Sequence, residues 1–286
     1  MLRIIYIIFI LLSLNCYKSK LYAQKKPTKQ LKVLTWNVYE LPFFINNTKR
    51  VKRAKGIVEV LKQTDYDVIV LQETYHKKSF QIIEEGLKQT FPYHIKTDRS
   101  RALLKHHHGL FIVSKLPAKV LGAITYKYCR GLDCLSKKGA ILIEIEKEGQ
   151  SFQLLGTHLQ AGNKNNHEAI RKTQRHQITN FLNQHKTNNV PQLLCGDFNT
   201  NYNNLALRDD LLNDLEIVDA TVPTEVTWPN KFFFTKKNHN TIVDYIFLKP
   251  NNFEGKTILS KVHYFYDEKL KIALSDHAAI EMLLMW

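Results

Sequence analysis

The sequence predicts a single α/β domain with mixed β-sheets, and two patterns in the chain support this prediction. Apolar runs rich in Val, Ile, Leu and Phe recur along the chain at the length of strands. Patterns with apolar residues three and four positions apart, typical of amphipathic helices, lie between these runs. Hydrophobic residues make up 44% of the 286 residues and aromatic ones 11%, which excludes a disordered chain.

Eight segments are expected to form strands. The run "DVIVL" is continuously apolar, as expected for a strand that is covered on both faces, whereas "AILIEIE" alternates, as expected for a half-exposed strand. The eight segments are 31–38, 67–73, 109–115, 139–146, 151–159, 192–199, 242–249 and 278–286.

Three segments are expected to form helices, namely 48–63, 80–91 and 167–185. In the third of them, four residues are predicted to form a partial apolar face: Ala169, Thr173, Ile178 and Leu182. No internal repeat and no linker interrupts the chain after residue 30, so the layered domain is expected to span 31–286.

The first residues predict export from the cytoplasm. A basic start, an apolar run of 11 residues from Ile4 to Leu14, and a small residue before a polar one are typical of a signal peptide. We expect residues 1–24 to act as this signal, with cleavage after Ala23, and residues 25–30 to form a linker. Cleavage before a lipid-modified Cys16 is the second interpretation. Either way, the protein is expected to be secreted or periplasmic.

The charge of the chain favours anionic partners. The net charge of +15 falls to +12 without residues 1–24, which hold three basic residues and no acidic one. Membrane surfaces, nucleic acids and acidic glycans are all compatible with this charge. In an oxidising compartment the spacing of Cys129 and Cys134 allows a small disulfide-closed loop, whereas Cys195 is expected to be buried and unpaired.

A distinctive set of polar side chains is found at the ends of the expected strands. Such strand ends are where α/β folds build sites. Asp244 is expected inside its strand, where a carboxylate requires a partner. The set comprises Asn37, Gln72, Glu73, His158, Gln160, Asp197, Asn199, Asp244, Asp276 and His277.

This set suits metal-assisted hydrolysis of a phosphodiester. Glu73, Asn37, Asp197 and Asp276 offer hard oxygen ligands, which fit Mg²⁺ better than zinc. Two histidines add proton transfer, one taking a proton from water and the other serving the leaving oxygen. Each of the six short segments that carry these residues has a simpler interpretation, as a turn, a cap or a solvated strand end. The occurrence of all six at strand boundaries in one chain favours a common site.

The ordered segments "TWNV", "LQE", "THLQA", "GDFN", "DYI" and "SDH" resemble the endonuclease/exonuclease/phosphatase superfamily, from Leu31 to Trp286. The resemblance implies a DNase I-like, four-layer α/β sandwich, in which two mixed β-sheets pack face to face and helices flank them. Within the superfamily, "GLFIVSKLP", "CLSKKGAILIEI" and "LGTHLQAG" resemble secreted bacterial sphingomyelinase C and neutral sphingomyelinases.

The resemblance implies a metal-dependent phosphodiesterase that hydrolyses sphingomyelin to ceramide and phosphocholine. Mg²⁺ is the expected cofactor, with Mn²⁺ or Co²⁺ as substitutes, and a monomer acting on a phospholipid membrane is expected. A secreted DNase-like nuclease, for which nucleic acid is the substrate, is the enzymatic alternative. A binding protein on an inactive scaffold is the non-enzymatic one.

The resemblance also implies the roles of individual residues. Glu73 is the expected principal metal ligand, with Asn37 beside it and Asp276 supporting the metal or its waters. His277 is the expected general base, held by Asp244, and His158 the expected partner of the leaving group. Asp197 and Asn199 are expected at the phosphate, the attacking water or a second metal. Lys138 is a candidate for phosphate binding, and Trp228 for packing or for the wall of the pocket.

Two segments are compatible with more than one interpretation. Tyr264, Phe265 and Tyr266 precede "SDH", where the secreted relatives have a longer hairpin with an exposed Trp-Phe tip. These aromatic residues are expected either to contact a membrane or to pack within the domain. His106, His107 and His108 are consecutive, so their side chains point in different directions and are expected in a loop near the site rather than at a metal.

Overall fold

The computed structural model describes residues 29–41, 49–96, 108–162, 165–218, 221–229, 240–269 and 271–286. The predictions for the signal peptide, for Cys16, for most of the linker and for His106 and His107 lie outside these residues. None of the described helices has the length and apolarity needed to cross a membrane.

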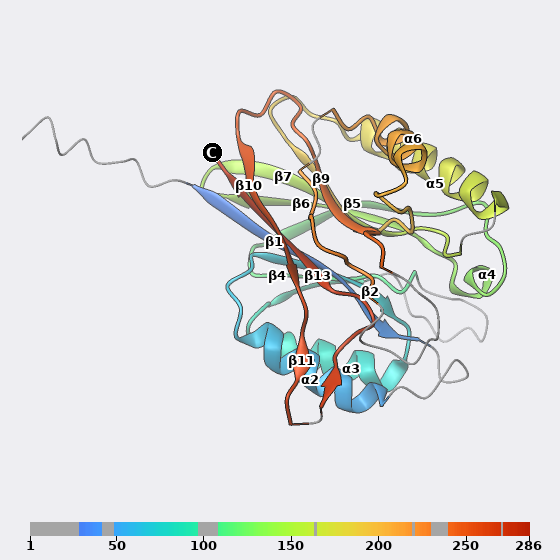
Figure 1. Ribbon diagram of the computed structural model, residues 1–286. Helices are drawn as coiled ribbons and strands as arrows, with labels where there is room; N and C mark the ends of the chain where they lie inside the picture. Colours follow the sequence, from blue (N-terminus) through green and yellow to red (C-terminus); the bar gives the residue numbers. More distant parts are fainter. Residues whose placement is uncertain are drawn as a thin grey trace, which may run out of the picture.

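Two mixed sheets form the centre of the domain (Figure 1). The first has the order β10-β13-β1-β2-β4-β3 and the second β5-β6-β7-β8-β9. In each sheet one central pair is parallel, β1 with β2 and β7 with β8. The strands of the first sheet are β1 (Gln30–Glu40), β2 (Val68–Thr74), β3 (Tyr93–Lys96), β4 (Phe111–Ser114), β10 (Lys256–His263) and β13 (Ala279–Met285). Those of the second are β5 (Ala118–Thr125), β6 (Gly139–Lys147), β7 (Gln150–His158), β8 (Gln192–Asp197) and β9 (Asp244–Lys249).

Helices cover the outer face of each sheet, which gives four layers (Figure 1). Helices α2 (Arg50–Lys62) and α3 (Lys77–Leu87) pack on the first sheet, and α5 (Asn165–Gln184) and α6 (Leu205–Leu215) on the second. A short helix, α4 (Asp133–Ser136), and a two-stranded ribbon of β11 (Tyr266–Asp267) and β12 (Ile272–Ala273) complete the elements of the residues that the structure describes. The predicted four-layer sandwich is therefore confirmed.

The alternation of side chains along the strands explains the layers. In β1, Val33 points into the core between the sheets, whereas Leu34 and Trp36 point toward α2 and α3. In β7, Leu154 and Leu155 divide in the same way between the central core and the core under α5. Both faces of these strands are buried, so their sequences are continuously apolar.

The eight predicted strands are all present, but two details of the predictions are wrong. Asp244 is the first residue of β9 rather than an internal one, because the main chain leaves the sheet just before it. In α5, Ile178 and Leu182 are buried as expected, but Ala169 is exposed. The buried face of α5 instead includes Arg175, whose guanidinium bonds to Asp214 at 2.9 Å.

The cysteine predictions are confirmed. Cys129 and Cys134 form a disulfide with an S–S distance of 2.09 Å. Cys195 is buried in β8 with a free thiol. Of the aromatic residues before "SDH", Phe265 packs on Trp36 with ring centroids 4.9 Å apart, which favours packing for this residue. Tyr264 donates a hydrogen bond to the Val226 carbonyl at 2.6 Å.

Candidate active site

The ends of the parallel strands β1 and β2 bring Asn37 and Glu73 together. Asn37 pairs with Gln72 in the register, and a β-bulge follows between Asn37 and Glu40. Glu73 has a φ of 59°, in the left-handed region that residues other than glycine seldom adopt. Bulges and such backbone angles gather at functional sites, where they redirect a side chain that a regular strand would point elsewhere.

The second sheet supplies three more side chains at the same edge. His158 ends β7 and pairs in the register with Asp197, which ends the parallel strand β8. Asp197 pairs in turn with Asp244 at the start of the antiparallel strand β9. Three neighbouring strands thus place a histidine and two carboxylates side by side, and all three residues are buried.

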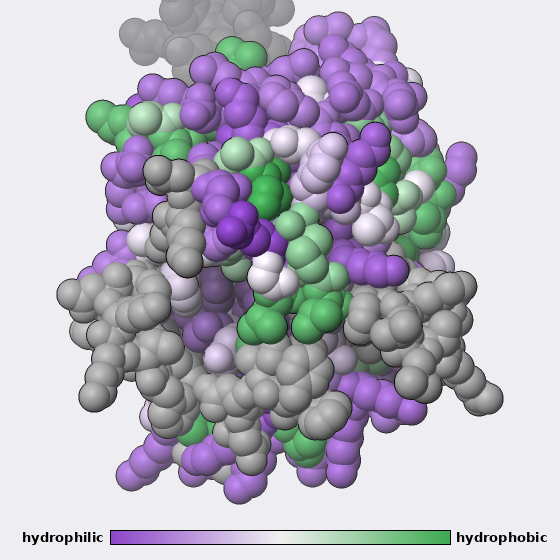
Figure 2. Space-filling model, turned by 90° about the vertical axis from the view of Figure 1, so that its right-hand side faces the viewer, coloured by the Kyte–Doolittle hydropathy of each residue, from purple (hydrophilic) through white to green (hydrophobic). Residues whose placement is uncertain are grey.

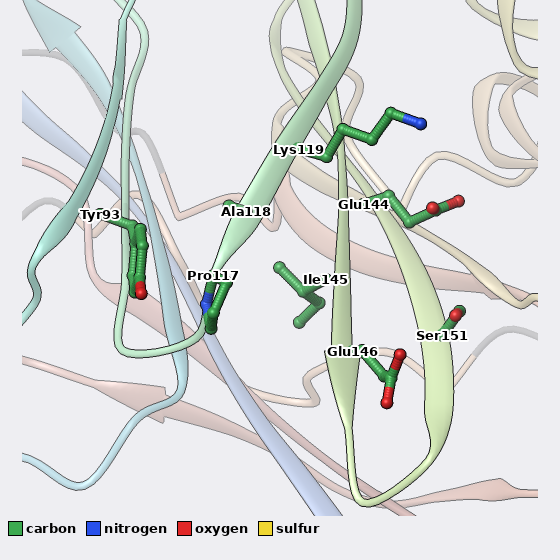
Figure 3. A pocket seen from close by; sticks show the side chains of 8 residues that line it. All are labelled: Tyr93, Pro117, Ala118, Lys119, Glu144, Ile145, Glu146 and Ser151. Atoms are coloured by element: carbon green, nitrogen blue, oxygen red, sulfur yellow. The ribbon is translucent and has the colours of Figure 1, made fainter.

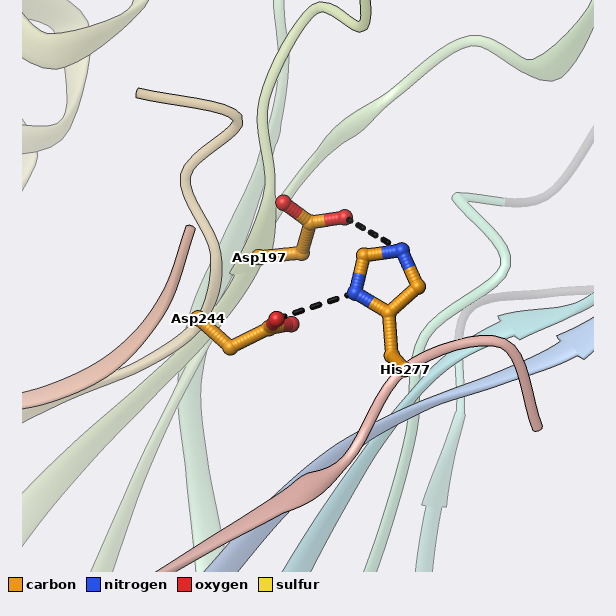
Figure 4. Close-up of side chains that lie close together, drawn as sticks. All are labelled: Asp197, Asp244 and His277. Atoms are coloured by element: carbon orange, nitrogen blue, oxygen red, sulfur yellow. Dashed lines mark hydrogen bonds and ion pairs between the residues drawn. The ribbon is translucent and has the colours of Figure 1, made fainter. Parts of the chain in front are cut away.

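His277 reaches this edge from the segment between β12 and β13. The Trp36 indole donates a hydrogen bond to the His277 carbonyl at 2.9 Å, which fixes the main chain there. The His277 ring lies between two carboxylates (Figure 4), with Nδ1 2.9 Å from Asp244 Oδ2 and Nε2 3.9 Å from Asp197 Oδ2. The predicted pairing of His277 with Asp244 is therefore present in the structure.

His158 lies at the centre of the remaining contacts. Its Nε2 is 2.9 Å from Lys138 Nζ, 3.4 Å from Asp197 Oδ2 and 3.9 Å from Glu73 Oε1. Asn37 joins the same group because its amide donates to Asp197 Oδ2 at 3.1 Å. The structure thus brings both sheets' predicted residues into one continuous network.

Lys138 is buried and has three neighbours for its ammonium group. They are His158 Nε2, the Leu159 carbonyl at 2.7 Å and Asp133 Oδ2 at 2.9 Å. A lysine ammonium has three N–H donors, so a contact with phosphate would require Lys138 to exchange one of these partners.

Asn199 and Trp228 border the network. The Asn199 amide donates to the Leu159 carbonyl at 3.1 Å, and its main-chain N–H donates to Asp197 Oδ1 at 2.9 Å. Asn199 thereby holds the Asp197 carboxylate in place. The Trp228 ring stacks on His277 with centroids 5.6 Å apart and an angle of 16° between the planes, so it forms a wall of the site. Of the three consecutive histidines, His108 is described by the structure, and its Nε2 forms a hydrogen bond with the Thr125 hydroxyl at 2.8 Å.

The two histidines have opposite electrostatic surroundings. Burial and the positive charge of Lys138 hold the pKa of His158 well below its usual value, so this ring is neutral. Burial also disfavours a charged His277, but the carboxylates of Asp244, Asp276 and Asp197 outweigh burial and raise the pKa of His277. The site therefore holds one neutral imidazole and one imidazole that attracts a proton.

Glu73 and Asp276 have the properties of ligands for a hard cation. Burial, followed by the charge of Asp276, raises the pKa of Glu73 to about 7. Glu73 Oε2 and Asp276 Oδ1 are buried and have no hydrogen-bond partner among the described residues. Carboxylate oxygens in this condition fit a divalent cation that prefers oxygen ligands.

Asp197, Asp244 and His277 form a second group whose ligand atoms lie within 4.8 Å of one another. Such a group is compatible with a metal ion, because metal-bound histidines often donate their other N–H to a carboxylate, as His277 does to Asp244.

The sequence interpretation missed Arg53, a buried residue that supports the main chain on either side of the site. The Arg53 side chain is fully buried and lies 3.1 Å from Glu40 Oε1. It also donates hydrogen bonds to the carbonyls of Val38, Tyr39 and Leu274 at 2.6 to 2.9 Å. Arg53 thus joins the bulged end of β1 to the segment that carries Asp276 and His277. A basic residue on a helix is usually exposed, so the local sequence gave no signal of this role.

Arg53→Met is expected to lower the free energy of unfolding by about 3–5 kcal/mol, because it leaves the Glu40 carboxylate buried without its partner. Urea unfolding measures this loss. The matched control is the double variant Glu40→Met with Arg53→Met, which should recover part of the stability. A loss below about 1 kcal/mol in the single variant would show that the pair is not needed for folding.

A separate pocket of about 350 Å³ lies between the edge strands of the two sheets (Figure 3). Tyr93 of β3 faces Pro117 across it, and Glu144, Glu146 and Lys119 add charges. Ser151, at the start of β7, lines this pocket, whereas His158 ends the same strand. The pocket is therefore distinct from the candidate site.

The fold and the site together define a class of protein. Its members are DNase I-like sandwiches in which polar residues from both sheets meet at one edge. Residues 34–277 match the Endonuclease/Exonuclease/phosphatase family, and the chain belongs to this family.

Curated relatives and solved structures are similar to the chain over most of its length. Sphingomyelinase C of Leptospira interrogans is 29% identical over 254 residues, which are 78% of this chain and 45% of that protein. This chain thus spans less than half of that relative. Phospholipase C of Staphylococcus aureus is 26% identical over 265 residues, which cover 83% of this chain and 79% of that protein.

Two solved structures illustrate the shared fold. A mutant of beta toxin from Staphylococcus aureus with bound magnesium ions has a TM-score of 0.73 and 23% identity, covering 88% of this chain and 99% of that one. The TDP2 protein of D. rerio, solved with a single-strand DNA product, has a TM-score of 0.69 and 16% identity, covering 89% and 98%.

Proposed function

We propose that this protein is a secreted, Mg²⁺-dependent phosphodiesterase that hydrolyses sphingomyelin to ceramide and phosphocholine. The observation that carries the proposal is the convergence of Glu73, His158, Asp197 and His277, from both sheets, at one edge of the sandwich. The names of the curated relatives, sphingomyelinase C and phospholipase C, support a choline phospholipid as substrate.

Glu73, Asn37 and Asp276 are the residues proposed to hold Mg²⁺. The unpartnered carboxylate oxygens of Glu73 and Asp276 support this assignment, as do the magnesium ions in the beta toxin structure. The bound cation would polarise a phosphoryl oxygen and offset the negative charge that develops there. Mn²⁺ and Co²⁺ are proposed as substitutes because they accept similar oxygen ligands.

His277 and Asp244 are proposed to activate the attacking water. In its neutral form, His277 Nε2 takes the proton of a water whose oxygen forms the new bond to phosphorus, while Asp244 keeps the proton on Nδ1. Asp197 is proposed to orient that water, and its Oδ2 lies 3.9 Å from His277 Nε2.

His158 is proposed to act at the opposite end of the phosphorus centre. The bond from phosphorus to the ceramide oxygen breaks, and this oxygen takes a proton from the Lys138 ammonium beside His158, while the proton taken up by His277 passes to solvent after the reaction and solvent restores that of Lys138. His158 is neutral and lies beside the ammonium of Lys138, so the pair offers N–H donors to the negative charge on the leaving oxygen. Trp228, stacked on His277, is proposed as a wall for the choline headgroup, since a quaternary ammonium binds aromatic faces.

A comparison of substrates tests this proposal. Vesicles of sphingomyelin, phosphatidylcholine or phosphatidylinositol and plasmid DNA are incubated with the protein, with EDTA or with added Mg²⁺, Mn²⁺ or Co²⁺. We expect phosphocholine release from sphingomyelin that EDTA abolishes and each of the three cations restores. Cleavage of DNA without phosphocholine release, with a steep dependence on salt, would instead identify a nuclease.

The remaining parts of the proposal concern the mature chain. Residues 1–23 are proposed as a signal peptide that is removed on export, and residues 31–286 as the catalytic domain, which acts as a monomer. The mass of the protein recovered from the medium tests the cleavage after Ala23. A lipid-bearing mass that begins at Cys16 would support the anchored form instead.

A further inference from the structure

The segment 127–137, called here the disulfide loop, exposes apolar side chains next to the candidate site. The Cys129–Cys134 bond closes it, and helix α4 lies within it. Three large side chains of the loop face solvent, Tyr128 with 59% of its surface exposed, Leu132 with 64% and Leu135 with 48%. Apolar side chains gathered in this way mark a surface that binds another apolar one.

The disulfide loop is firmly attached to the strand end that carries His158. The Gln160 side chain accepts a hydrogen bond from the Arg130 N–H at 2.8 Å and donates one to the Arg130 carbonyl at 3.1 Å. Asp133 accepts a hydrogen bond from the Ala161 N–H at 2.6 Å and lies 2.9 Å from Lys138 Nζ. The loop is thus anchored to Gln160, which is two residues after His158 in the chain, and to Lys138, which contacts His158.

The loop also contacts helix α5. Gln174 of this helix donates to the Tyr128 carbonyl at 3.0 Å, and Gln177 accepts from the Lys127 N–H at 3.3 Å. Main-chain anchors at 127, 128 and 130 keep the backbone in place while the side chains of Tyr128, Leu132 and Leu135 remain outside. A pre-ordered apolar surface loses little conformational entropy when it binds.

The charges of the loop are basic and exposed. Lys127, Arg130 and Lys137 all face solvent, whereas the acidic residue, Asp133, is turned inward to Ala161 and Lys138. The face on which α4 lies shows hydrophobic atoms near its centre, with hydrophilic ones above them (Figure 2). Leucine and tyrosine side chains with flanking cations are the composition that binds the interface of an anionic bilayer.

We infer that the disulfide loop docks the protein on a lipid bilayer that contains anionic lipids, with Tyr128, Leu132 and Leu135 inserted at the headgroup level. The inference deepens the proposed function and rests on it for the lipid substrate. The attachment of the loop to Gln160 and Lys138 would then hold the site at the membrane surface, where a phosphodiester of a membrane lipid lies.

Binding to vesicles that contain no sphingomyelin separates docking from catalysis. The probe is a vesicle of phosphatidylcholine with or without phosphatidylglycerol, and sedimentation measures the bound fraction. The double variant Leu132→Ser with Leu135→Ser should reduce partitioning at least about tenfold, because two leucines lose their apolar contact. Replacing Lys127, Arg130 and Lys137 by Gln should remove the preference for phosphatidylglycerol.

The matched control is Val120→Ser with Val218→Ser. These residues are also exposed, Val218 at 99%, but they lie outside the loop. Strand β9 begins at Asp244 in the site and ends at Lys249, so Lys249 marks the end of the strand that lies away from the site. Lys249 donates a hydrogen bond to the carbonyl of Leu215, which is three residues before Val218. Val218 therefore lies near the end of the domain that is remote from the site. The control should bind vesicles as the unmodified protein does, and both variants should keep the turnover of a soluble p-nitrophenyl phosphodiester.

A tryptophan introduced into the disulfide loop reports directly how deeply the loop enters the bilayer. Fluorescence of Leu132→Trp should shift to the blue on vesicles and be quenched by lipids with brominated acyl chains, whereas that of Val218→Trp should not. Equal vesicle binding by the loop variant and the control, or no binding by the unmodified protein, would overturn the inference. Loop-dependent binding without sphingomyelin hydrolysis would instead contradict the proposed function and leave the docking role standing.

Discussion

Glu73→Gln is expected to lower the turnover of sphingomyelin by at least about 10³-fold at saturating Mg²⁺, because it removes the carboxylate proposed as the principal metal ligand. The glutamine side chain has almost the same shape, so the left-handed backbone at residue 73 and the packing around it should persist. Release of phosphocholine measures the loss, and titration with Mg²⁺ should show weaker binding of the cation.

The same substitution is expected to stabilise the metal-free protein at alkaline pH. The pKa of Glu73 is raised from an ordinary 4.5 to about 7, so the folded protein retains a proton that the unfolded chain releases as the pH rises through this window. Above pH 7 the ionised, buried carboxylate therefore destabilises the fold. Glutamine does not ionise and should raise the free energy of unfolding by about 1–3 kcal/mol at pH 8 in EDTA.

Glu85→Gln is the control, because Glu85 is exposed on α3 and its loss of charge should change neither turnover nor stability. A Glu73→Gln protein that keeps its turnover within about tenfold would exclude Glu73 as the essential ligand. Equal stability of the two variants at pH 8 would show that the Glu73 carboxylate is not strained by burial.

The parts of the fold that the sequence predicts are those encoded by local apolar patterns. All eight expected strands form, and the polar residues that follow them meet because parallel strands end at the same edge of a sheet. His158 and Asp197 illustrate this relation: they are 39 residues apart and become register neighbours. Strand β5 was missed because its residues are mostly half-exposed or exposed, so its apolar pattern is weak.

The features that the sequence did not predict depend on distant partners. Arg53 is buried because its acceptors lie up to 221 residues away, and nothing near it in the chain indicates them. The left-handed backbone of Glu73 has a similar cause, since it accompanies a bulge in the neighbouring strand. Local patterns thus located the site residues, but not the buried contacts that hold them in position.

His277→Ala is expected to lower turnover by about 10³- to 10⁴-fold, in the range of a general base and the orientation that it provides. Asp244→Asn should cause a smaller loss of about 10²- to 10³-fold, because an amide can no longer stabilise a protonated His277 through the 2.9 Å contact. The free energy of unfolding of both variants should lie within about 1.5 kcal/mol of that of the unmodified protein. His185→Ala, at a half-buried position just after the end of α5 and beside Phe181, is the control.

The nature of the leaving group distinguishes His277 from His158. A p-nitrophenyl ester of phosphocholine releases an anion that is stable without a proton, so help to the leaving oxygen contributes little to its hydrolysis. His158→Ala should therefore lose at least about tenfold less activity on this ester than on sphingomyelin. His277→Ala should lose the same factor on both, because water must be activated in either reaction. Equal losses for His158→Ala on the two substrates would instead assign His158, 3.4 Å from Asp197, to the attacking side of the phosphorus centre.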